Sequence, residues 1–382
     1  MFPEKLTNKL RIRSEKDALR ELKVQNELID FSSNDYLGFA QSEDIFKKAI
    51  QLTERVPLNG ATGSRLLSGN HLLYQQLEAN LCEFYQAEAS LVFNSGYDAN
   101  TGFFSSIPQK GDIIFYDEYI HASIRDGMQM SNAKTYKFKH NDFADLESRI
   151  NRNIDRQKNS ADKNTIYVVT ESVFSMDGDT PDLKSLTVLC EKFNCYLIVD
   201  EAHAVGVFGK GKIQEQELEN RVFARVITFG KALGSHGAAI LSSEALKAYL
   251  INFARSFIYT TALPPHSIAT VIAAHQKLKE EKVIVENLKK NIKFFKEQLQ
   301  NLKLREYFIE SNSAIQSCII PGNENVKSIA NQLQNKGFDV RPILSPTVPG
   351  GEERLRFCLH SYNSRSEIEA VLKELAIFAT HK

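Results

Sequence analysis

The amino-acid sequence predicts an α/β fold, with a mostly parallel sheet in a large domain and a smaller α+β domain toward the C-terminal end. Apolar, β-branched runs recur at residues 166–170, 196–200 and 225–229. They lie roughly 30 residues apart, which is the length of a βαβ unit with its crossover helix. Each run is almost continuously apolar, as expected of strands that helices cover on both faces. The spacing and the apolar runs together favour a parallel sheet.

The elements around these runs fit the same arrangement. Residues 91–93 and 112–116 are earlier strand candidates, and residues 183–193 carry apolar side chains at helical spacing between two of the strands. The pattern changes after the Pro-Pro pair at 264–265, where residues 266–304 form a long amphipathic stretch rich in Lys and Glu. We expect this stretch to be helical, with its charged side chains in solvent.

Shorter elements are predicted toward the C-terminal end. A last helix is expected over residues 366–380, with Ser364 or Ser366 as its N-cap. Strand candidates precede it at residues 314–320, 340–342 and 354–359. We therefore predict an N-terminal arm, a large α/β domain and a smaller C-terminal domain, over residues 1–39, 40–263 and 264–382.

Composition and charge exclude several classes of protein. The 382 residues include 47 Lys and Arg and 47 Asp and Glu, so the formal net charge is zero and gives no long-range attraction to nucleic acid or anionic membranes. No run approaches the roughly 20 apolar residues of a membrane span, and residues 1–16 lack the apolar core of a signal peptide. The five cysteines are scattered without a CxxC pair, and no His/Cys spacing resembles a zinc site. We expect a cytoplasmic protein with reduced thiols, no metal, no nucleic-acid partner and no membrane association.

Three segments carry residues with chemistry of their own. Residues 94–97 (Asn-Ser-Gly-Tyr) form a strand-to-helix turn. Residues 199–203 (Val-Asp-Glu-Ala-His) end one strand, and residues 228–234 (Thr-Phe-Gly-Lys-Ala-Leu-Gly) end the next. In a parallel sheet the carboxyl ends of the strands meet at one edge, where ligands bind. We therefore expect a ligand site at this edge.

The side chains at this edge are those that pyridoxal phosphate (PLP) chemistry requires. Lys231 lies on a glycine-flanked turn and could form a Schiff base with the cofactor. Asp200 could keep the pyridine nitrogen protonated, so that the ring acts as an electron sink. Backbone N–H groups beside Gly96 could approach the phosphate at a helix N-terminus, and the His121 ring could stack on the pyridine. Taken alone, Lys231 would more often be a surface lysine and His121 a loop histidine, so the prediction depends on the whole set.

Residues 200–203 also spell Asp-Glu-Ala-His, the motif of DEAH-type helicase ATPases. Such an ATPase needs a GxxxxGK[ST] phosphate loop upstream, and the sequence has none. The balanced charge also argues against a nucleic-acid motor. The helicase interpretation is therefore rejected.

Short motifs follow one another along the whole chain. They lie at residues 17–20 (DALR), 31–38 (FSSNDYLG), 63–69 (GSRLLSG), 95–97 (SGY), 121–123 (HAS), 170–179 (TESVFSMDGD), 200–203 (DEAH), 228–231 (TFGK), 253–265 (FARSFIYTTALPP) and 346–350 (PTVPG). Each motif is weak alone, but together and in this order they are specific. Over nearly its whole length the chain resembles the α-oxoamine synthase family of fold-type I PLP enzymes.

This resemblance implies a seven-stranded, mostly parallel sheet in the large domain, and it implies roles for individual residues. Lys231 would form the Schiff base, and Asp200 would face the ring nitrogen. His203 would bond the phenolic oxygen of the cofactor, and His121 would stack on its ring. The ring and phosphate would also be held by Gly96, Tyr97, Ser175 and Thr228. The substrates would be met by Arg20, Asn34, His121, Thr347 and Arg356.

The resemblance also assigns different residues to the two substrates. Arg20 and Thr347 match positions that meet the acyl group, and Arg356 matches the position that receives the amino-acid carboxylate. A planar guanidinium suits that task because it binds a carboxylate bidentately. Arg341 and Arg354 compete with Arg356, and Arg354 shares a strand face with it, so the choice of Arg356 depends on the family match.

The family builds its active site at the interface of a homodimer. Asn34 would line the site of the partner subunit, and Thr260 or Thr261 would reach the partner's phosphate. Residues 63–65 would belong to an interface loop or form only a glycine turn with a surface arginine. His236 follows the lysine turn and is assigned no role.

The activity that the resemblance implies is a PLP-dependent decarboxylative condensation of an amino acid with an acyl thioester, so the chain would be an acyltransferase. Residues 228–231, 237–239 and 255–265 most resemble members that condense L-alanine with a pimeloyl thioester, on coenzyme A or acyl-carrier protein, in biotin synthesis. The alternatives within the family are glycine C-acetyltransferase, 5-aminolevulinate synthase and serine palmitoyltransferase. A non-catalytic paralogue is a further alternative, but such paralogues typically lose the lysine that Lys231 provides.

Overall fold

The computed structural model describes residues 2–16, 18–20, 22, 27–157 and 164–379. The chain divides into two compact units, which are described separately. The sheet unit comprises Asp35–Ser175 and Thr180–Glu286, and the terminal unit comprises Met1–Asn34, Met176–Asp179 and Asn287–Lys382. The predicted limits at residues 39 and 263 stay a prediction.

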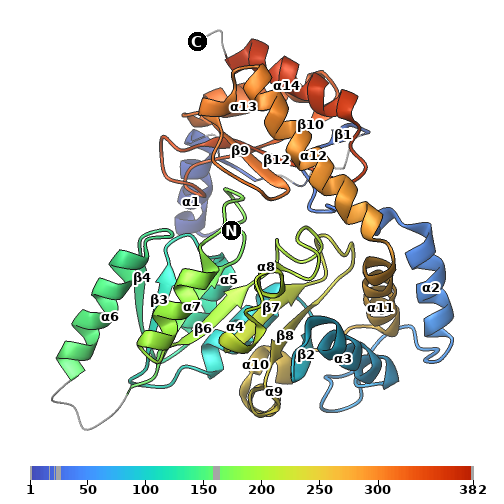
Figure 1. Ribbon diagram of the computed structural model, residues 1–382, viewed down its shortest axis with the longest axis vertical. Helices are drawn as coiled ribbons and strands as arrows, with labels where there is room; N and C mark the ends of the chain where they lie inside the picture. The colour runs from blue at the N-terminus through green and yellow to red at the C-terminus, as the bar shows by residue number, and fades with distance from the viewer. Residues whose placement is uncertain (1, 17, 21, 23–26, 158–163, 380–382) are drawn as a thin grey trace. The chain divides into compact units, whose positions relative to one another are not determined.

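A seven-stranded sheet forms the centre of the sheet unit (Figure 1). Its strands are β2 Ala89–Phe93, β3 Ile113–Asp117, β4 Lys134–Phe138, β5 Ile166–Glu171, β6 Tyr196–Asp200, β7 Ala224–Thr228 and β8 Ala238–Ser242. The order across the sheet is β2-β8-β7-β6-β5-β3-β4. Neighbouring strands are parallel except that β8 runs antiparallel to both β2 and β7. The predicted mostly parallel seven-stranded sheet is confirmed.

Helices pack against both faces of this sheet. The helices of the sheet unit are α2 Glu43–Thr53, α3 Leu72–Tyr85, α4 Gly96–Ser106, α5 Ala122–Gln129, α6 Phe143–Gln157, α7 Leu183–Lys192, α8 Lys212–Glu215, α9 Glu244–Phe253, α10 Arg255–Ile258 and α11 Pro265–Glu280, with 3-10 turns at Phe39–Gln41 and Glu219–Arg221. Val169 and Ile198 pack with residues of α4, α5, α9 and α10, whereas Val168 and Leu197 pack with residues of α6 and α7. Successive residues of a strand point to opposite faces, so a sheet covered on both faces needs almost continuously apolar strands.

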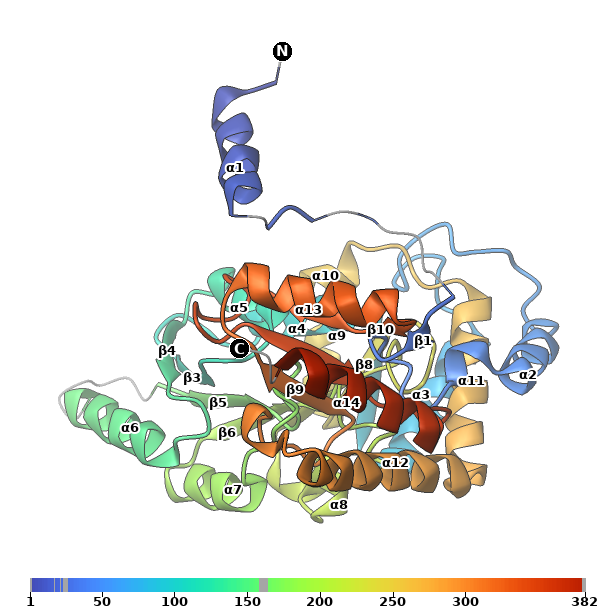
Figure 2. The ribbon, with the colours of Figure 1, turned by 90° about the horizontal axis from the view of Figure 1, so that it is seen from above.

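The terminal unit contains smaller sheets and the remaining helices. Its elements are α1 Glu4–Glu15, β1 Ile29–Asp30, most of α12 Lys282–Asn301, a 3-10 turn Arg305–Tyr307, β9 Ile315–Ile319, α13 Asn323–Asn335, β10 Phe338–Asp339, β11 Arg341–Ile343, β12 Arg354–Cys358 and α14 Arg365–Ala379. Strands β11, β12 and β9 form an antiparallel sheet, and β1 pairs with β10 in parallel. Helix α13 packs with β11 and with α14, and Figure 2 shows both helices. These elements form the predicted α+β arrangement.

Two local predictions are refined. The stretch predicted as helical at 266–304 is two helices, because Glu281 has φ −107° and ψ 72° and ends α11. Helix α14 begins at Arg365, so Ser364 is its N-cap. The Ser364 Oγ accepts from the Glu367 N–H at 3.2 Å, and the Glu367 side chain accepts from the Ser364 N–H at 2.7 Å, a reciprocal capping box. Among the described residues, no helix combines the length and apolar character needed to cross a membrane.

Candidate active site

Asp200 ends β6 and its carboxylate is buried, with 6% of the residue exposed. Its Oδ2 accepts a hydrogen bond of 2.8 Å from Nδ2 of Asn100, which lies on α4, and its Oδ1 accepts from the Ala202 N–H at 2.9 Å. The Asn100 Nδ2 also donates to Ser123 Oγ at 3.0 Å. A buried carboxylate needs such donors to keep its charge. Asn100 and Ala202 therefore fix the orientation of Asp200 without neutralising it.

A second buried carboxyl group, that of Glu171, ends the neighbouring strand β5. Glu171 and Asp200 are Cα partners in the parallel register, and Glu171 is 3% exposed. Its Oε1 accepts a 2.6 Å hydrogen bond from the His121 backbone N–H. Burial and then the negative charge of Asp200 raise the pKa of Glu171 to about 8, although the positive charge of Lys231 acts in the other direction. Glu171 is therefore mostly protonated at neutral pH.

His121 lies directly before α5, and its ring is held by Ser123. Its Nδ1 accepts from the Ser123 N–H at 3.2 Å and lies 2.8 Å from Ser123 Oγ, so the neutral ring carries its proton on Nε2. Desolvation by surrounding atoms lowers the pKa of His121, opposed by Asp200 and reinforced by Lys231. The residue as a whole is exposed. A neutral imidazole is thus presented at the edge of the site.

Lys231 lies on the turn between β7 and β8 and is half-buried. Its charge influences the pKa of both His121 and Glu171. The turn depends on Gly234, which has φ +57° and whose absent Cβ would lie 2.0 Å from the backbone N of Ala40; only glycine fits such a position. The structure therefore brings Lys231 into electrostatic range of His121 and Glu171.

The N-terminus of α4 lies beside the end of β7. Ser95 is the N-cap of α4, and its Oγ accepts from the Asp98 N–H at 3.0 Å. A Cβ on Gly96 would lie 2.7 Å from Cγ2 of Thr228, so the backbone of Gly96 comes close to Thr228 only because it lacks a side chain. The first N–H groups of a helix bind anions such as phosphate. Gly96 and Thr228 are thus brought together at such an end.

The other residues predicted to hold the cofactor have different surroundings. Tyr97 is 50% exposed and donates to Oδ2 of Asp126 at 2.6 Å; this hydrogen bond raises the pKa of Tyr97. His203 is 5% exposed, with Nδ1 2.8 Å from the hydroxyl of the fully buried Tyr36. Ser175 is half-buried in the turn after β5. His203 and Tyr36 therefore form a fixed buried pair, whereas Tyr97 remains accessible.

Asn94 connects the α4 end of the site to the segment before α11. Its Nδ2 donates to Thr260 Oγ1 at 3.0 Å and to the Thr261 carbonyl at 2.6 Å. The two threonines predicted to reach a partner's phosphate are thus held beside residues 94–96 of their own chain. His236, to which no role is assigned, is exposed.

Arg65, in the loop at 63–65, is held by its own chain. Its Nη1 donates to Glu78 Oε1 at 2.6 Å, and its Nε and Nη2 donate to Asn70 Oδ1 at 3.0 and 2.9 Å. The guanidinium also lies 4.0 Å from the centre of the Tyr74 ring. Only 11% of the Arg65 side chain is exposed, so it is not the surface arginine of the glycine-turn interpretation, and its contacts give it a structural role.

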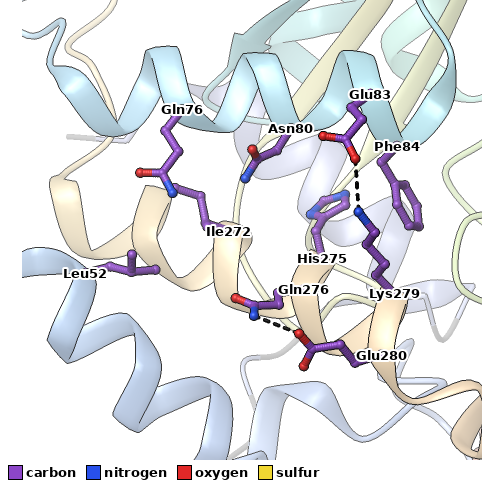
Figure 3. Close-up of a pocket in the computed structure, with 10 residues that line it drawn as sticks. All are labelled: Leu52, Gln76, Asn80, Glu83, Phe84, Ile272, His275, Gln276, Lys279 and Glu280. Atoms are coloured by element: carbon purple, nitrogen blue, oxygen red, sulfur yellow. Dashed lines mark hydrogen bonds and ion pairs between the residues drawn. The ribbon is translucent and has the colours of Figure 1, made fainter.

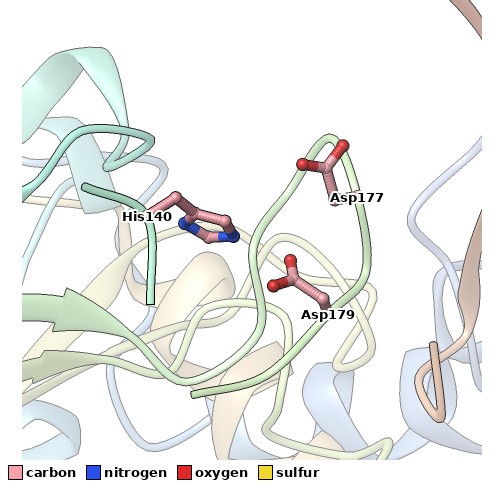
Figure 4. Close-up of side chains that lie close together, drawn as sticks. All are labelled: His140, Asp177 and Asp179. Atoms are coloured by element: carbon pink, nitrogen blue, oxygen red, sulfur yellow. The ribbon is translucent and has the colours of Figure 1, made fainter. Parts of the chain in front are cut away.

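In the terminal unit, Arg354 is 2% exposed and forms an ion pair with Asp177. Asp177 and Asp179 project from the loop after β5 (Figure 4). A buried arginine that is paired with a buried carboxylate is already neutralised. The charge of Arg354 is thus compensated within the protein by Asp177.

Arg356 and Asn34 are brought together in the same unit. The Arg356 Nη2 donates to Asn34 Oδ1 at 2.9 Å, which is a neutral acceptor. Arg341, by contrast, pairs with Asp339 at 2.8 Å. Arg20 and Thr347 are both exposed. Arg354 and Arg341 are thus each paired with a carboxylate of the same unit, and the choice of Arg356 still depends on the family match.

A pocket of about 350 Å³ in the sheet unit contains none of the predicted site residues. Figure 3 shows its lining from α2, α3 and α11, with Lys279 paired to Glu83 at 3.0 Å. His275 at its base is buried, and its Nδ1 lies 2.9 Å from the Val271 carbonyl while Nε2 lies 3.1 Å from the Tyr85 hydroxyl. Burial lowers the pKa of His275 to about 4. This histidine is a satisfied core residue.

The comparisons with known proteins agree with this geometry. Residues 26–375 match the family described as aminotransferase class I and II, and the chain belongs to that family. Within this class, the chain is similar to the 8-amino-7-oxononanoate synthase of Emericella nidulans, with 39% identity over 98% of this chain and 95% of the relative.

Solved structures show the same relationship. A serine palmitoyltransferase from S. paucimobilis with a bound PLP–myriocin aldimine superposes with a TM-score of 0.87 at 26% identity, covering 98% of this chain and 97% of its own. The 8-amino-7-oxononanoate synthase from Francisella tularensis superposes with a TM-score of 0.76 at 29% identity, covering 94% and 99%. The family and fold that the motifs predicted are confirmed.

Sequence reasoning missed several residues that the contacts add to this site. They are Tyr36, Asn100, Ser123 and Glu171. Three of them lie inside quoted motifs without an assigned role. Asn100 lies outside every motif, but it is four residues after Gly96 on one helix, and such residues share a face. That spacing is the signal that could have found it.

Proposed function

We propose that this chain is a PLP-dependent acyltransferase that condenses L-alanine with a pimeloyl thioester, with loss of carbon dioxide, to form 8-amino-7-oxononanoate in biotin synthesis. The observation that carries the proposal is the buried Asp200 carboxylate, held by Asn100 and the Ala202 N–H within range of Lys231 and His121. The similarity to 8-amino-7-oxononanoate synthases over almost the whole chain supports the choice of substrates.

The residues of the sheet unit fit PLP. The Asp200 carboxylate offers a negative charge for a pyridinium nitrogen, and Lys231 offers an amine for covalent attachment. The end of α4 offers N–H donors for a phosphate, and the lack of a side chain at Gly96 keeps this end open beside Thr228. When bound, PLP supplies an electron sink for the negative charge that develops on the Cα of the amino acid.

Each of these side chains then has a defined task. Asp200 would hold the proton on the ring nitrogen, with its carboxylate oriented by Asn100 and the Ala202 N–H. The Lys231 amine would hold the cofactor covalently and, when free, would take the Cα proton of the amino acid. His121 presents a neutral ring for stacking, since desolvation lowers its pKa. His203, fixed by Tyr36, donates toward the phenolic oxygen.

The substrates are assigned to the terminal unit and to a second subunit. Arg356 binds the amino-acid carboxylate, and Arg20 and Thr347 meet the acyl group, carried on coenzyme A or acyl-carrier protein. Tyr97, Ser175 and Thr228 complete the cofactor contacts.

Asn34 contributes to the site of the partner subunit in a homodimer. The proposed location of the protein is the cytoplasm. Sedimentation of the purified chain tests the dimer.

The test of the cofactor assignment is chemical. The purified chain is loaded with PLP, reduced with borohydride, digested and analysed by mass spectrometry. The phosphopyridoxyl group should lie on the peptide that contains Lys231, and Lys231→Ala should show none. A group found on another lysine would overturn the assignment.

The substrate assignment has a specific competitor, because the serine palmitoyltransferase of S. paucimobilis superposes with the higher TM-score. Alanine, serine and glycine are therefore compared, each with pimeloyl-, palmitoyl-, acetyl- and succinyl-coenzyme A. We expect the highest kcat/KM for alanine with the pimeloyl thioester. Turnover confined to serine with the palmitoyl thioester, or to glycine with the acetyl thioester, would replace the proposed function with that alternative.

A further inference from the structure

Glu171 has a position that the proposed reaction does not use directly. Its carboxyl group ends β5 in register with Asp200 on β6, and the residue is 3% exposed. Its Oε1 accepts from the His121 backbone N–H at 2.6 Å. His121 is the residue at which α5 starts. The carboxyl group of Glu171 therefore anchors the main chain that carries the His121 ring.

The charges that face Glu171 come from several elements. Asp200 on β6 and Asp117 on β3 are negative, Lys231 on the turn after β7 is positive, and the His121 N–H at the start of α5 is a neutral donor. Two buried carboxyl groups side by side cannot both ionise at low cost. Asp200 is held by two donors, from Asn100 and Ala202, whereas the carboxyl group of Glu171 accepts from one donor of the described part of the chain, the His121 N–H. The proton therefore belongs on Glu171, in agreement with its pKa of about 8.

We infer that Glu171 is a positioning residue: as an uncharged acid it anchors the start of α5, and with it the His121 ring, while leaving Asp200 as the only negative charge of the pair. The inference deepens the proposed function and rests on it for the meaning of Asp200 and His121. The protonation of Glu171 can be measured without turnover.

The first experiment separates the anchor from the charge in the PLP-loaded protein. Glu171→Gln keeps an oxygen that accepts from the His121 N–H, whereas Glu171→Leu removes it. We expect Glu171→Gln to keep kcat within about threefold of wild type near pH 7, and Glu171→Leu to lose at least about tenfold. The absorbance of bound PLP in wild type should change with pH, with a midpoint at about pH 8, because ionised Glu171 adds a second negative charge near the ring. Glu171→Gln should not show this change.

The second experiment is thermal unfolding of the full chain without PLP. Glu171 has a pKa of about 8 in the folded state against 4.5 ordinarily, so between these values the folded state binds one more proton than the unfolded state. The stability that this proton contributes is complete below about pH 4.5 and is lost as the pH rises to about 8. The Tm of Glu171→Gln relative to wild type should therefore rise by at least about 3 °C between about pH 5.5 and 8.5.

Glu83→Gln is the matched control, because Glu83 is an exposed glutamate with a surface partner, Lys279. Its Tm difference from wild type should be the same at both pH values. An equal difference for Glu171→Gln at both pH values, or a Glu171→Gln absorbance titration identical to wild type, overturns the inference. If wild type binds no PLP, the proposed function fails, while the unfolding experiment still decides whether Glu171 is uncharged. If Glu171→Leu does not fold, the Glu171→Gln results decide.

Discussion

Asp200 and Glu201 are consecutive buried carboxylates with opposite surroundings. Asp200 is held by neutral donors, the Asn100 amide and the Ala202 N–H. Glu201 is fully buried and pairs with Arg225 at 2.6 Å, and its Oε1 also accepts from the Ile213 N–H at 2.9 Å. Successive side chains in an extended chain point in opposite directions, which separates the two environments. A carboxylate held by neutral donors keeps its charge for a ligand, whereas one paired with arginine belongs to the framework.

The comparison is tested most strongly at Asp200. Asp200→Asn removes the charge but keeps the shape, so kcat should fall by at least about a thousandfold, equivalent to about 4 kcal/mol. PLP binding should persist, and the free energy of unfolding should change by less than about 1 kcal/mol. Steady-state kinetics and urea unfolding give both values. Activity within about tenfold of wild type would contradict the assigned role.

Arg225 tests the structural role assigned to Glu201. Arg225→Met leaves Glu201 buried without its guanidinium partner and should lower the free energy of unfolding by about 3 kcal/mol. Because the defect is an unpaired charge, the double variant Arg225→Met/Glu201→Leu should recover most of that loss. Urea unfolding of the three proteins measures both effects. If the double variant is no more stable than the single one, the pair has a different function from the one assigned here.

Asn100 tests whether the neutral donors orient the Asp200 carboxylate for catalysis. Asn100→Ala removes one charge-assisted hydrogen bond and should lower kcat/KM by about tenfold. Asn252→Ala is the control, because that exposed amide donates only to the Ala248 carbonyl of its own helix. The control should match wild type. Equal kinetics in both variants would mean that the Ala202 N–H alone is sufficient.

The arginines of the terminal unit give a further test, because the family resemblance assigns the amino-acid carboxylate to Arg356. Arg356→Lys loses the planar fork and should raise the KM for the amino acid by about fivefold with a smaller change in kcat. Arg341→Lys, whose partner is Asp339, should leave that KM unchanged. A larger effect at Arg341 would transfer the carboxylate role to it.

The fold was predictable where burial leaves a clear pattern. Strands β5, β6 and β7 are buried on both faces, so their sequences are almost continuously apolar. Strand β4 was not predicted, because it is a largely exposed edge strand with the sequence Lys-Thr-Tyr-Lys-Phe. Strand β8 was also missed, since Ala238–Ser242 begins with two alanines, which have little strand preference. The break at Glu281 has no glycine or proline to mark it.

Residues of the candidate site could be predicted only where they lie in recognisable motifs. Lys231, Asp200 and His121 could be proposed because each lies in a segment with recognisable chemistry. The contacts that complete the site join residues far apart in the chain, such as Asn100 with Asp200 and Glu171 with the His121 N–H. Periodicity predicts the face on which a side chain lies, but it does not predict which residue of another element it meets. The protonation of Glu171 could not be predicted because it depends on burial.

The hydrogen bond from the His121 backbone to Glu171 matters for redesign of the site. Because the anchor is a main-chain N–H, it does not depend on which side chain occupies position 121. Aromatic replacements such as phenylalanine, tyrosine or tryptophan can therefore be placed there while the Cα stays fixed. The side chain at position 121 can therefore be varied in libraries that exchange the stacking ring, while the surrounding backbone is kept.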